Sequence, residues 1–199
     1  MRLPKGYLGI CHKNSTAFTV PAALEWTHSV LSAGSTLYNW ASQQSTKEML
    51  AGRGRVFIFP NAGSTENATH WIVRHYQRGG ILARHLEDRY LVTRTPRPLK
   101  ELQASVEARS RGIPTPRVIG GAAYRSGVFY RADLVTEYLS DVTDLASVVF
   151  GVNERNMTVC TTALHAAGKL VSLLEKERVA HADLNASNIL VNQLGGGSS

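Results

Sequence analysis

The sequence predicts an α+β fold, with a strand-rich first half and a helical last third. Residues 56–59 (VFIF) and 70–76 (HWIVRHY) are short, apolar-rich runs that end at turn residues, which is typical of strands. Residues 155–176 instead repeat apolar side chains at alternating spacings of three and four, from Met157 to Leu174. This pattern predicts a helix with one buried face.

The composition is that of a globular chain with a basic surface. Its 199 residues are 43% hydrophobic and 19% charged, which suits one sizeable domain or two small lobes. The formal net charge of +7 favours polyanionic partners, namely nucleic acid, nucleotide phosphates or an anionic membrane surface. Cys11 and Cys160 are far apart and lack ligand-like neighbours, which argues against a disulfide framework or a zinc site and for a reducing compartment.

The sequence shows no membrane or export signal. No apolar run approaches the roughly 18 residues that a membrane span requires. Near the N-terminus, Pro4, His12 and Lys13 interrupt any signal-peptide core. We therefore expect a soluble, cytoplasmic protein that can touch a membrane peripherally.

The first part of the chain predicts one hairpin. Residues 1–50 are weakly patterned, and only residues 20–31 have helical spacing. The runs at 56–59 and 70–76 flank the polar segment 61–67 (NAGSTEN), so they predict two antiparallel strands around a turn.

The middle of the chain mixes helices and strands. Residues 81–90 and 99–111 have helical spacing, and Gly112, followed by Pro114, ends the second helix. Three strand-like runs and a short helix follow, at residues 118–123, 127–133, 134–139 and 144–150. The change from strands to helices predicts a join between two lobes within residues 135–144.

A polar loop late in the chain carries the strongest chemical signal. His181, Asp183 and Asn188 lie between the helix at 155–176 and the apolar residues 189–191. In phosphoryl transfer, an Asp at this spacing orients and deprotonates the acceptor hydroxyl, and the Asn side-chain oxygen binds a metal that bridges the donor phosphates. The alternative is that Asp183 and Asn188 are ordinary turn and cap residues.

Four separated segments accompany this signal at 181–190 (HADLNASNIL): residues 73–80 (VRHYQRGG), 88–91 (DRYL), 112–117 (GIPTPR) and 130–137 (YRADLVTE). Together, over about residues 50–192, they resemble the bacterial lipopolysaccharide kinases. The resemblance implies a protein-kinase-like two-lobe fold, with a strand-rich N-lobe and an incomplete helical C-lobe. It also implies transfer of the ATP γ-phosphate, with Mg²⁺, to a 3-deoxy-D-manno-octulosonic acid (Kdo) hydroxyl of Kdo-lipid A. The expected location is cytoplasmic, peripheral on the inner membrane of a Gram-negative bacterium.

The resemblance implies a role for each of several side chains. Arg74 would grip the α- and β-phosphates from its strand, where kinases usually have Lys, and Glu101 on the following helix would pair with it. Glu107 is a second candidate for that carboxylate. Asp183 would be the catalytic base and Asn188 the Mg²⁺ ligand. The alternative is that Arg74 and Glu101 are ordinary solvent-exposed side chains.

Backbone segments around ATP follow from the same resemblance. Gly52 and Gly54 before a strand, or equally the turn at 61–66, could cover the phosphates, although a plain turn explains the two glycines better. Glu137 and Leu139 lie where an inter-lobe hinge would present backbone groups to adenine; otherwise they end an edge strand.

A basic stretch extends over residues 74–111. It comprises Arg74, His75, Arg78, Arg84, His85, Arg89, Arg94, Arg97, Lys100, Arg109 and Arg111. We expect it to attract lipid A phosphates and the anionic inner leaflet, or otherwise to be a solvated charged surface. Aromatic residues are not interleaved with these charges as a nucleic-acid platform would need, so we expect no nucleic-acid partner.

The expected organisation has four parts. Residues 1–50 are an N-terminal extension, residues 51–139 the kinase-like N-lobe, residues 140–192 a partial C-lobe with the catalytic loop, and residues 193–199 a disordered Gly/Ser tail.

The family has a second metal-binding carboxylate further along, but here no Asp or Glu follows Asp183. We expect a truncated or frame-altered chain, or one whose missing part a neighbour supplies. Loss of that carboxylate should reduce the activity by orders of magnitude. The strand that pairs with residues 189–191 should then be missing, and the helix at 155–176 should expose apolar surface. Two other functions stay open: an inactive kinase-like module that binds nucleotide or lipid, and a small-molecule phosphotransferase of aminoglycoside or choline type.

Overall fold

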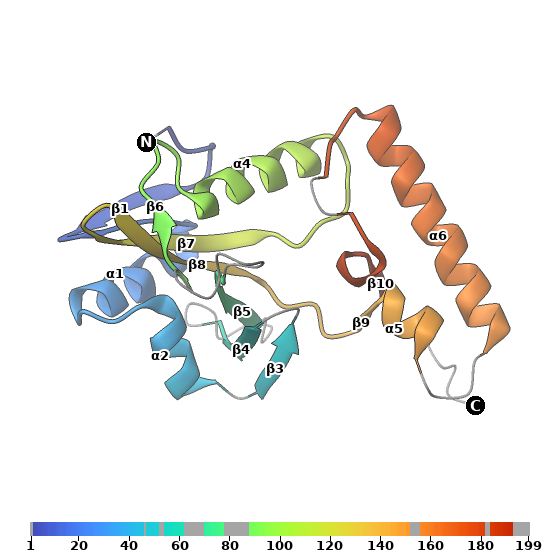
Figure 1. Ribbon diagram of the computed structural model, residues 1–199, viewed down its shortest axis with the longest axis horizontal. Coiled ribbons are helices and arrows are strands. Elements are labelled where there is room, and N and C mark those ends of the chain that lie inside the picture. The colour runs from blue at the N-terminus through green and yellow to red at the C-terminus, as the bar shows by residue number, and fades with distance from the viewer. Residues whose placement is uncertain are drawn as a thin grey trace. The chain divides into compact units, whose positions relative to one another are not determined.

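The computed structural model describes residues 2–45, 47–51, 54–61, 70–77, 88–151, 156–181 and 184–192. The chain forms two compact units (Figure 1). Unit 1 comprises Met1–Glu107 and Thr115–Tyr138, and unit 2 comprises Ala108–Pro114 and Leu139–Ser199.

The described strands of unit 1 form one antiparallel sheet of eight. Their order is β1-β2-β7-β8-β5-β4-β3, and β6 also pairs with β8. The strands are β1 (Leu8–His12), β2 (Ser15–Thr19), β3 (Lys47–Ala51), β4 (Gly54–Pro60), β5 (His70–His75), β6 (Tyr90–Leu91), β7 (Val118–Ser126) and β8 (Phe129–Glu137). The strand-rich first part of the predicted α+β fold is confirmed.

The strands bear out some sequence predictions and correct others. β4 and β5 pair as the predicted antiparallel hairpin, and the turn expected between them lies almost wholly outside the described residues. The two strands predicted at 127–133 and 134–139 are instead the single strand β8, which pairs with β5 and β7 across the expected break. Of the helix predicted at 81–90, residues 81–87 lie outside the described residues and Tyr90 belongs to β6.

Residues 1–50, expected as an extension, are instead an integral part of unit 1. β1 and β2 continue the sheet beyond β7, and β3 continues it beyond β4. The 3₁₀ turn η1 (Pro21–Ala23) and helices α1 (Leu24–Ser32) and α2 (Leu37–Gln44) complete this segment. Its strands are short and partly polar, which explains the weak pattern in the sequence. β1 pairs locally with β2, and β3 pairs locally with β4, whereas β2 pairs with the distant strand β7.

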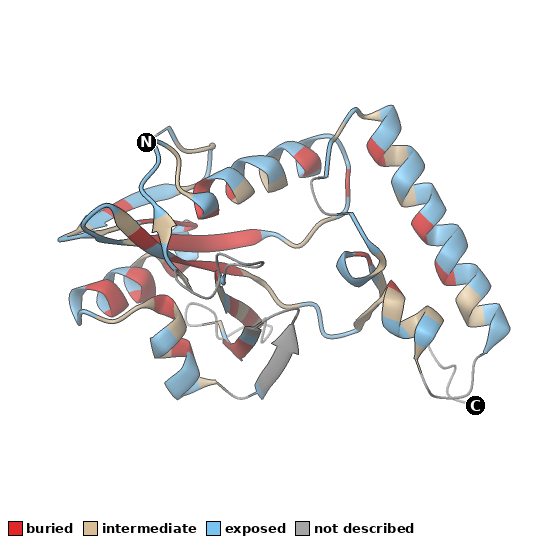
Figure 2. Cartoon of the chain, in the orientation of Figure 1, coloured by how far each residue is buried: buried red, intermediate tan, exposed pale blue. Residues whose placement is uncertain are grey.

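Apolar cores cover both faces of this sheet (Figure 2). On one face, α1 and α2 pack against β4 and β5 through an aromatic cluster with ring centroids 5.3 to 6.0 Å apart. The cluster consists of Trp26, Trp40, Phe59 and Trp71. On the other face, α4 (Arg97–Ser110) buries Leu99 and Leu102 against β2, β7 and β8, which confirms the predicted second helix.

The alternation of side chains along β5 decides which face each residue serves. Val73 belongs to the core under α1 and α2, whereas Tyr76 belongs to the core under α4. Arg74 lies opposite Leu134 of β8, which is also in the core under α4. Residues opposite one another on paired strands share a face, so Arg74 points to the α4 face.

The start of α4 is held by contacts with the sheet, and its end is marked by a glycine. Its first backbone N–H, that of Arg97, donates to Tyr130 Oη at 3.0 Å. Gly121 of β7 leaves room for the start of the helix, because a Cβ there would lie 3.0 Å from Pro98 Cβ. Gly112 follows the end of the helix, as predicted, in the left-handed conformation (φ 75°) that glycine adopts without strain.

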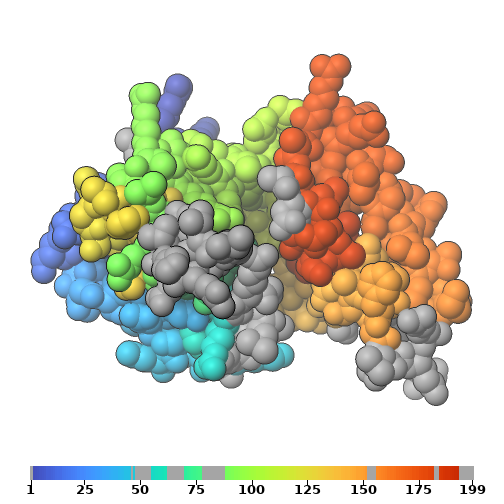
Figure 3. Space-filling model, in the orientation of Figure 1, coloured from blue at the N-terminus to red at the C-terminus, as the bar shows by residue number. Residues whose placement is uncertain are grey.

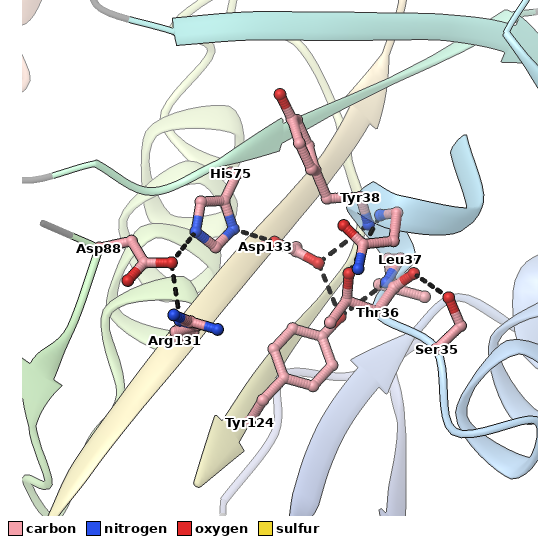
Figure 4. Close-up of polar contacts among 10 residues, drawn as sticks. Ser35, Thr36, Leu37, Tyr38, His75, Asp88, Tyr124, Arg131 and Asp133 are labelled. Atoms are coloured by element: carbon pink, nitrogen blue, oxygen red, sulfur yellow. Dashed lines mark hydrogen bonds and ion pairs between the residues drawn. The ribbon is translucent and has the colours of Figure 1, made fainter. Parts of the chain in front are cut away.

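A network of ionisable side chains lies between the sheet and α2 (Figure 4). Asp133 of β8 is fully buried, and its carboxylate accepts hydrogen bonds from His75 Nδ1 at 2.6 Å and Tyr124 Oη at 2.7 Å. His75 Nε2 lies 3.1 Å from Asp88 Oδ2, which also pairs with Arg131 Nε at 2.7 Å. Because both partners of the imidazole are carboxylates, they favour the protonated, positively charged form of His75, in which both ring nitrogens donate.

The network changes the protonation equilibria of its members. Burial opposes the charge on His75, but the hydrogen bonds and charges of Asp133 and Asp88 outweigh it and raise the pKa above the usual 6.5. Burial likewise opposes the charge on Asp88, yet His75 and Arg131 lower the pKa of this carboxyl. Burial, followed by the charge of Asp133, raises the pKa of Tyr124, which therefore stays a phenol that can donate.

The same carboxylate satisfies the start of α2. The N–H of Leu37 donates to Tyr124 Oη at 2.8 Å, and the N–H of Tyr38 donates to Asp133 Oδ2 at 2.9 Å. The N–H of Asn39, the third in the helix, donates to Thr36 Oγ1 at 3.0 Å. A carboxylate at the positive end of a helix dipole is favourable, so Asp133 joins α2 to the sheet.

Unit 2 is mainly helical, as predicted. It contains β9 (Val142–Asp144), α5 (Leu145–Phe150), α6 (Met157–Lys176), the 3₁₀ turn η2 (Ala186–Asn188) and β10 (Leu190–Asn192). β9 and β10 pair antiparallel over three residues each. The expectation that residues 189–191 lack a partner strand is therefore wrong, because a three-residue strand such as β9 leaves no periodic signal in the sequence.

Helix α6 is confirmed, but its apolar residues form two stripes where one was predicted. The buried stripe is Ala163, Ala167 and Leu174, and the exposed stripe is Met157, Leu164 and Val171. Most of the helix is accordingly exposed in Figure 2. The expected exposure of apolar surface on this helix is confirmed.

Helix α6 also corrects the expectation that no segment is long and apolar enough to span a membrane. By length and composition alone, its 20 residues meet that criterion. Core helices of water-soluble proteins meet it too, and α6 contributes to both small cores of unit 2. Its outer surface is orange in Figure 3.

The charged state of His75 predicts a pH dependence of stability. A histidine whose folded pKa is raised stabilises the fold fully below its unfolded pKa, and this contribution disappears as the pH rises through the folded pKa. We expect the free energy of unfolding, measured by urea denaturation, to fall as the pH rises above about 6.5. The total fall is about 1.4 kcal/mol for each pH unit that separates the unfolded from the folded pKa of His75.

The matched variants are His75→Gln, which should lose this pH dependence, and His28→Gln, which changes an exposed histidine of α1 and should keep it. An unchanged pH dependence in His75→Gln would contradict the assignment.

Candidate functional site

The predicted partners Arg74 and Glu101 form an ion pair on the α4 face of unit 1. Arg74 Nη2 donates to Glu101 Oε2, joining β5 to α4. The side chains are 50% and 32% exposed, so the guanidinium remains open to solvent on one side. The pair uses Glu101 and not the second candidate, Glu107. Its role in binding phosphate stays a prediction.

Two further side chains surround this pair, and sequence reasoning missed both. The ring of Tyr76 contacts two guanidinium groups, with its centroid 5.5 Å from Arg74 Cζ and 5.0 Å from Arg97 Cζ. Arg97 Nε also lies 3.6 Å from Glu101 Oε1. The spacing could have revealed them: Tyr76 follows Arg74 by two residues on a strand, and Arg97 precedes Glu101 by one helical turn.

Tyr76 remains a neutral phenol in this setting. The residue is 6% exposed. Burial, followed by the negative charge of Glu101, raises its pKa far above the usual value, and the charges of Arg74 and Arg97 oppose this shift without cancelling it. The ring therefore presents its π face to both guanidinium groups without adding a charge.

The proposed hinge residues lie at the end of β8 and beyond it. Glu137 Oε1 accepts the backbone N–H of Arg117 at 2.6 Å, and the Glu137 N–H donates to Arg117 O at 2.9 Å. The N–H of Tyr138 donates to His70 O at 2.9 Å. These N–H groups are thus engaged within the sheet of unit 1. Leu139 is the first residue of the second segment of unit 2, and the role of both hinge residues stays a prediction.

The predicted catalytic loop belongs to unit 2. Asp183 lies outside the described residues, so its place in the structure stays a prediction. Asn188 is exposed at the end of η2, and its N–H donates to Asn185 O at 3.0 Å. The next residue, Ile189, is buried, and its carbonyl accepts the N–H of Leu145 at 2.8 Å. Asn188 is thereby held between a turn and an anchored residue.

The candidate phosphate-covering segments are mostly outside the described residues. This holds for Gly52 and for residues 62–66, whereas Gly54 begins β4. The structure describes the basic stretch in part: residues 78–87, which include Arg78, Arg84 and His85, lie outside it. In unit 1 its exposed members are Arg74, Arg89, Arg94, Arg97 and Lys100, whereas His75 belongs to the network of Asp133. Arg109 and Arg111 are exposed in unit 2.

Comparison with known proteins supplies the family. A family model described as the lipopolysaccharide kinase (Kdo/WaaP) family matches residues 39–198. A 3-deoxy-D-manno-octulosonic acid kinase of Xylella fastidiosa (strain M23) is 35% identical over 160 residues, which cover 78% of this chain and 59% of the relative. The enzyme of the same name from Vibrio vulnificus (strain CMCP6) is 26% identical over 155 residues, covering 77% of this chain and 61% of the relative.

A solved structure is also similar to part of the chain. It is described as WaaP in complex with acyl carrier protein, and it has a TM-score of 0.37 and 16% sequence identity over 68% of this chain and 45% of its own. The chain spans about three fifths of the length of the two curated relatives. With the family model matching most of its residues, the chain belongs to the lipopolysaccharide kinase (Kdo/WaaP) family.

Proposed function

We propose that this chain forms part of an ATP-dependent phosphotransferase that phosphorylates a Kdo hydroxyl of Kdo-lipid A in lipopolysaccharide core biosynthesis. Membership of the lipopolysaccharide kinase family and the names of the curated relatives support this proposal. The observation in the structure that carries it is the ion pair between Arg74 of β5 and Glu101 of α4. A strand cation held by a helix carboxylate is the phosphate-positioning device of kinases.

Each predicted site residue has a role in this proposal. Arg74, oriented by Glu101, contacts the α- and β-phosphates of ATP, and backbone groups of Glu137 and Leu139 contact adenine. Asp183 accepts the proton of the attacking sugar hydroxyl. Because the transition state of phosphoryl transfer carries its charge on the phosphoryl oxygens, cations fixed in position contribute most of the rate enhancement.

Mg²⁺ fits the chemistry of the loop in unit 2. Asn188 supplies a neutral carboxamide oxygen, and Mg²⁺ prefers hard oxygen ligands. When bound, the metal would neutralise charge on the donor phosphates. The 3₁₀ turn and the buried Ile189 would hold Asn188 in place for this purpose.

A phosphotransfer assay tests the proposal. A full-length version of the protein is incubated with ATP, Mg²⁺ and Kdo-lipid A, and the lipid is analysed by mass spectrometry, with a relative named Kdo kinase as positive control. We expect phosphorylated lipid, reduced about 10²- to 10⁴-fold by Asp183→Asn and about 10²- to 10³-fold by Arg74→Gln. Arg125→Gln, which changes an exposed arginine of β7, is the matched control.

The other outcomes identify the alternatives. Nucleotide-dependent thermal stabilisation without any transfer would indicate a binding module. Transfer to choline or an aminoglycoside, and not to Kdo-lipid A, would indicate a small-molecule phosphotransferase.

The proposed metal ligand makes a separate prediction. Removing the side-chain oxygen in Asn188→Ala should raise the Mg²⁺ concentration that half-saturates nucleotide binding by at least about tenfold. Asn188→Asp should restore binding, because it keeps an oxygen ligand. The control is Asn192→Ala, an equivalent change at an exposed residue of β10. Equal Mg²⁺ dependence in Asn188→Ala and the wild type would exclude Asn188 as a ligand.

We also propose that the protein binds peripherally to the anionic cytoplasmic face of the inner membrane. The exposed basic residues of unit 1 support this, since each Lys or Arg near such a surface contributes about 1 kcal/mol. The double variant Arg94→Gln, Lys100→Gln should lower co-sedimentation with phosphatidylglycerol vesicles by about fivefold per charge removed. Binding should also weaken at high salt, and equal binding to neutral phosphatidylcholine vesicles would contradict the proposal.

A further inference from the structure

The surroundings of Arg74 form a layered cluster on the α4 face of unit 1. The ring of Tyr76 is buried, and the guanidinium groups of Arg74 and Arg97 lie 5.5 and 5.0 Å from its centroid. Both guanidinium groups also face the Glu101 carboxylate, Arg74 at Oε2 and Arg97 at Oε1. Arg97 further lies 5.7 Å from the ring centroid of Tyr90.

We propose that Tyr76 and Arg97 are positioning residues that fix the guanidinium of Arg74, and that Tyr76 makes arginine, and not lysine, the cation required on this strand. The use of Arg74 for nucleotide binding rests on the proposed function above. The fixing of its guanidinium by Tyr76 and Arg97 does not, and the two can be tested separately.

The shapes of the two cations explain the preference for arginine. A guanidinium is planar, so it can lie against an aromatic ring while its edge donates to a carboxylate. A lysine ammonium has no face to stack and is strongly hydrated. Arg74 is half exposed, and an ion pair this exposed holds its geometry weakly by itself. The aromatic ring supplies the second constraint that orients the group.

Arg97 contacts the second oxygen of the Glu101 carboxylate. It lies one helical turn before Glu101 and takes Oε1, which leaves Oε2 for Arg74. Two guanidinium cations and one carboxylate leave one net positive charge, because Tyr76 stays neutral. The cluster therefore keeps the positive charge that a polyphosphate needs after Glu101 has been paired.

A double-mutant cycle with nucleotide binding tests the preference for arginine. The affinity of the chain for a fluorescent ATP analogue with Mg²⁺ is compared for Arg74 and Arg74→Lys, with either Tyr76 or Tyr76→Leu. We expect Arg74→Lys to weaken binding about three- to tenfold with Tyr76 present, and less than about twofold in the Tyr76→Leu background. Arg97→Gln should weaken binding by a similar factor, whereas Tyr76→Phe, which keeps the ring, and the control Arg125→Gln should not.

Arginine side-chain NMR tests the positioning without any ligand. The Nε–H signal of Arg74 should show the ring-current shift of a group above an aromatic face. The shift should persist in Tyr76→Phe, disappear in Tyr76→Leu and decrease in Arg97→Gln. If the wild type binds no nucleotide but shows this pattern, the positioning is supported and the proposed function is not.

Two results would overturn the inference. One is an equal cost of Arg74→Lys in both backgrounds. The other is an Arg74 signal that is the same in the wild type and in Arg97→Gln, a variant of a half-exposed residue that should fold normally.

Discussion

The structure of unit 1 depends on one buried charge, the carboxylate of Asp133. Burying an ionised carboxylate costs several kcal/mol unless its oxygens are hydrogen-bonded. Here the donors come from His75 of β5, Tyr124 of β7 and the N–H of Tyr38 in α2, while Asp133 itself belongs to β8. Three strands and a helix must therefore be in place together to supply these hydrogen bonds, and loss of any one donor would remove a hydrogen bond from the buried carboxylate.

This constraint also decides where Arg74 points. His75 lies opposite Asp133 in the pairing of β5 with β8, so the network fixes the register of these two strands. A slip by one residue would exchange the faces of the sheet and move Arg74 away from Glu101 of α4. The buried network on one face and the Arg74–Glu101 ion pair on the other are thus two consequences of a single strand register.

Local patterns in the sequence correctly predicted the elements that form through contacts between neighbouring residues. The β4–β5 hairpin, α4 with its glycine stop and α6 all follow from spacing and turn residues. The Arg74–Glu101 pair is not local and was predicted from the resemblance to kinases. Sequence reasoning missed the role of residues 1–50 and the pairing of His75 with Asp133. The pairing of β2 with β7 and that of His75 with Asp133 depend on partners far along the chain, whereas β1 and β3 are short, weakly patterned strands of local hairpins. The positions of Tyr76 and Arg97 could have been predicted, since Tyr76 is two residues from Arg74 and Arg97 is one helical turn from Glu101.

Arg74 and Asn188, two residues of the proposed site, are held in place by different numbers of packing contacts and hydrogen bonds. Arg74 lies in a sheet with apolar cores on both faces, whereas Asn188 is held by one 3₁₀ turn, by Ile189 and by the short pairing of β9 with β10. Local opening is easier where fewer buried contacts must be broken. A cation that positions phosphate acts through preorganisation and needs the stronger support. A metal ligand can gain order from the metal itself, because ligand binding adds its free energy to the stability of the bound state. Mg²⁺ is therefore expected to order the loop of Asn188, whereas the cluster around Arg74 is set before any ligand binds.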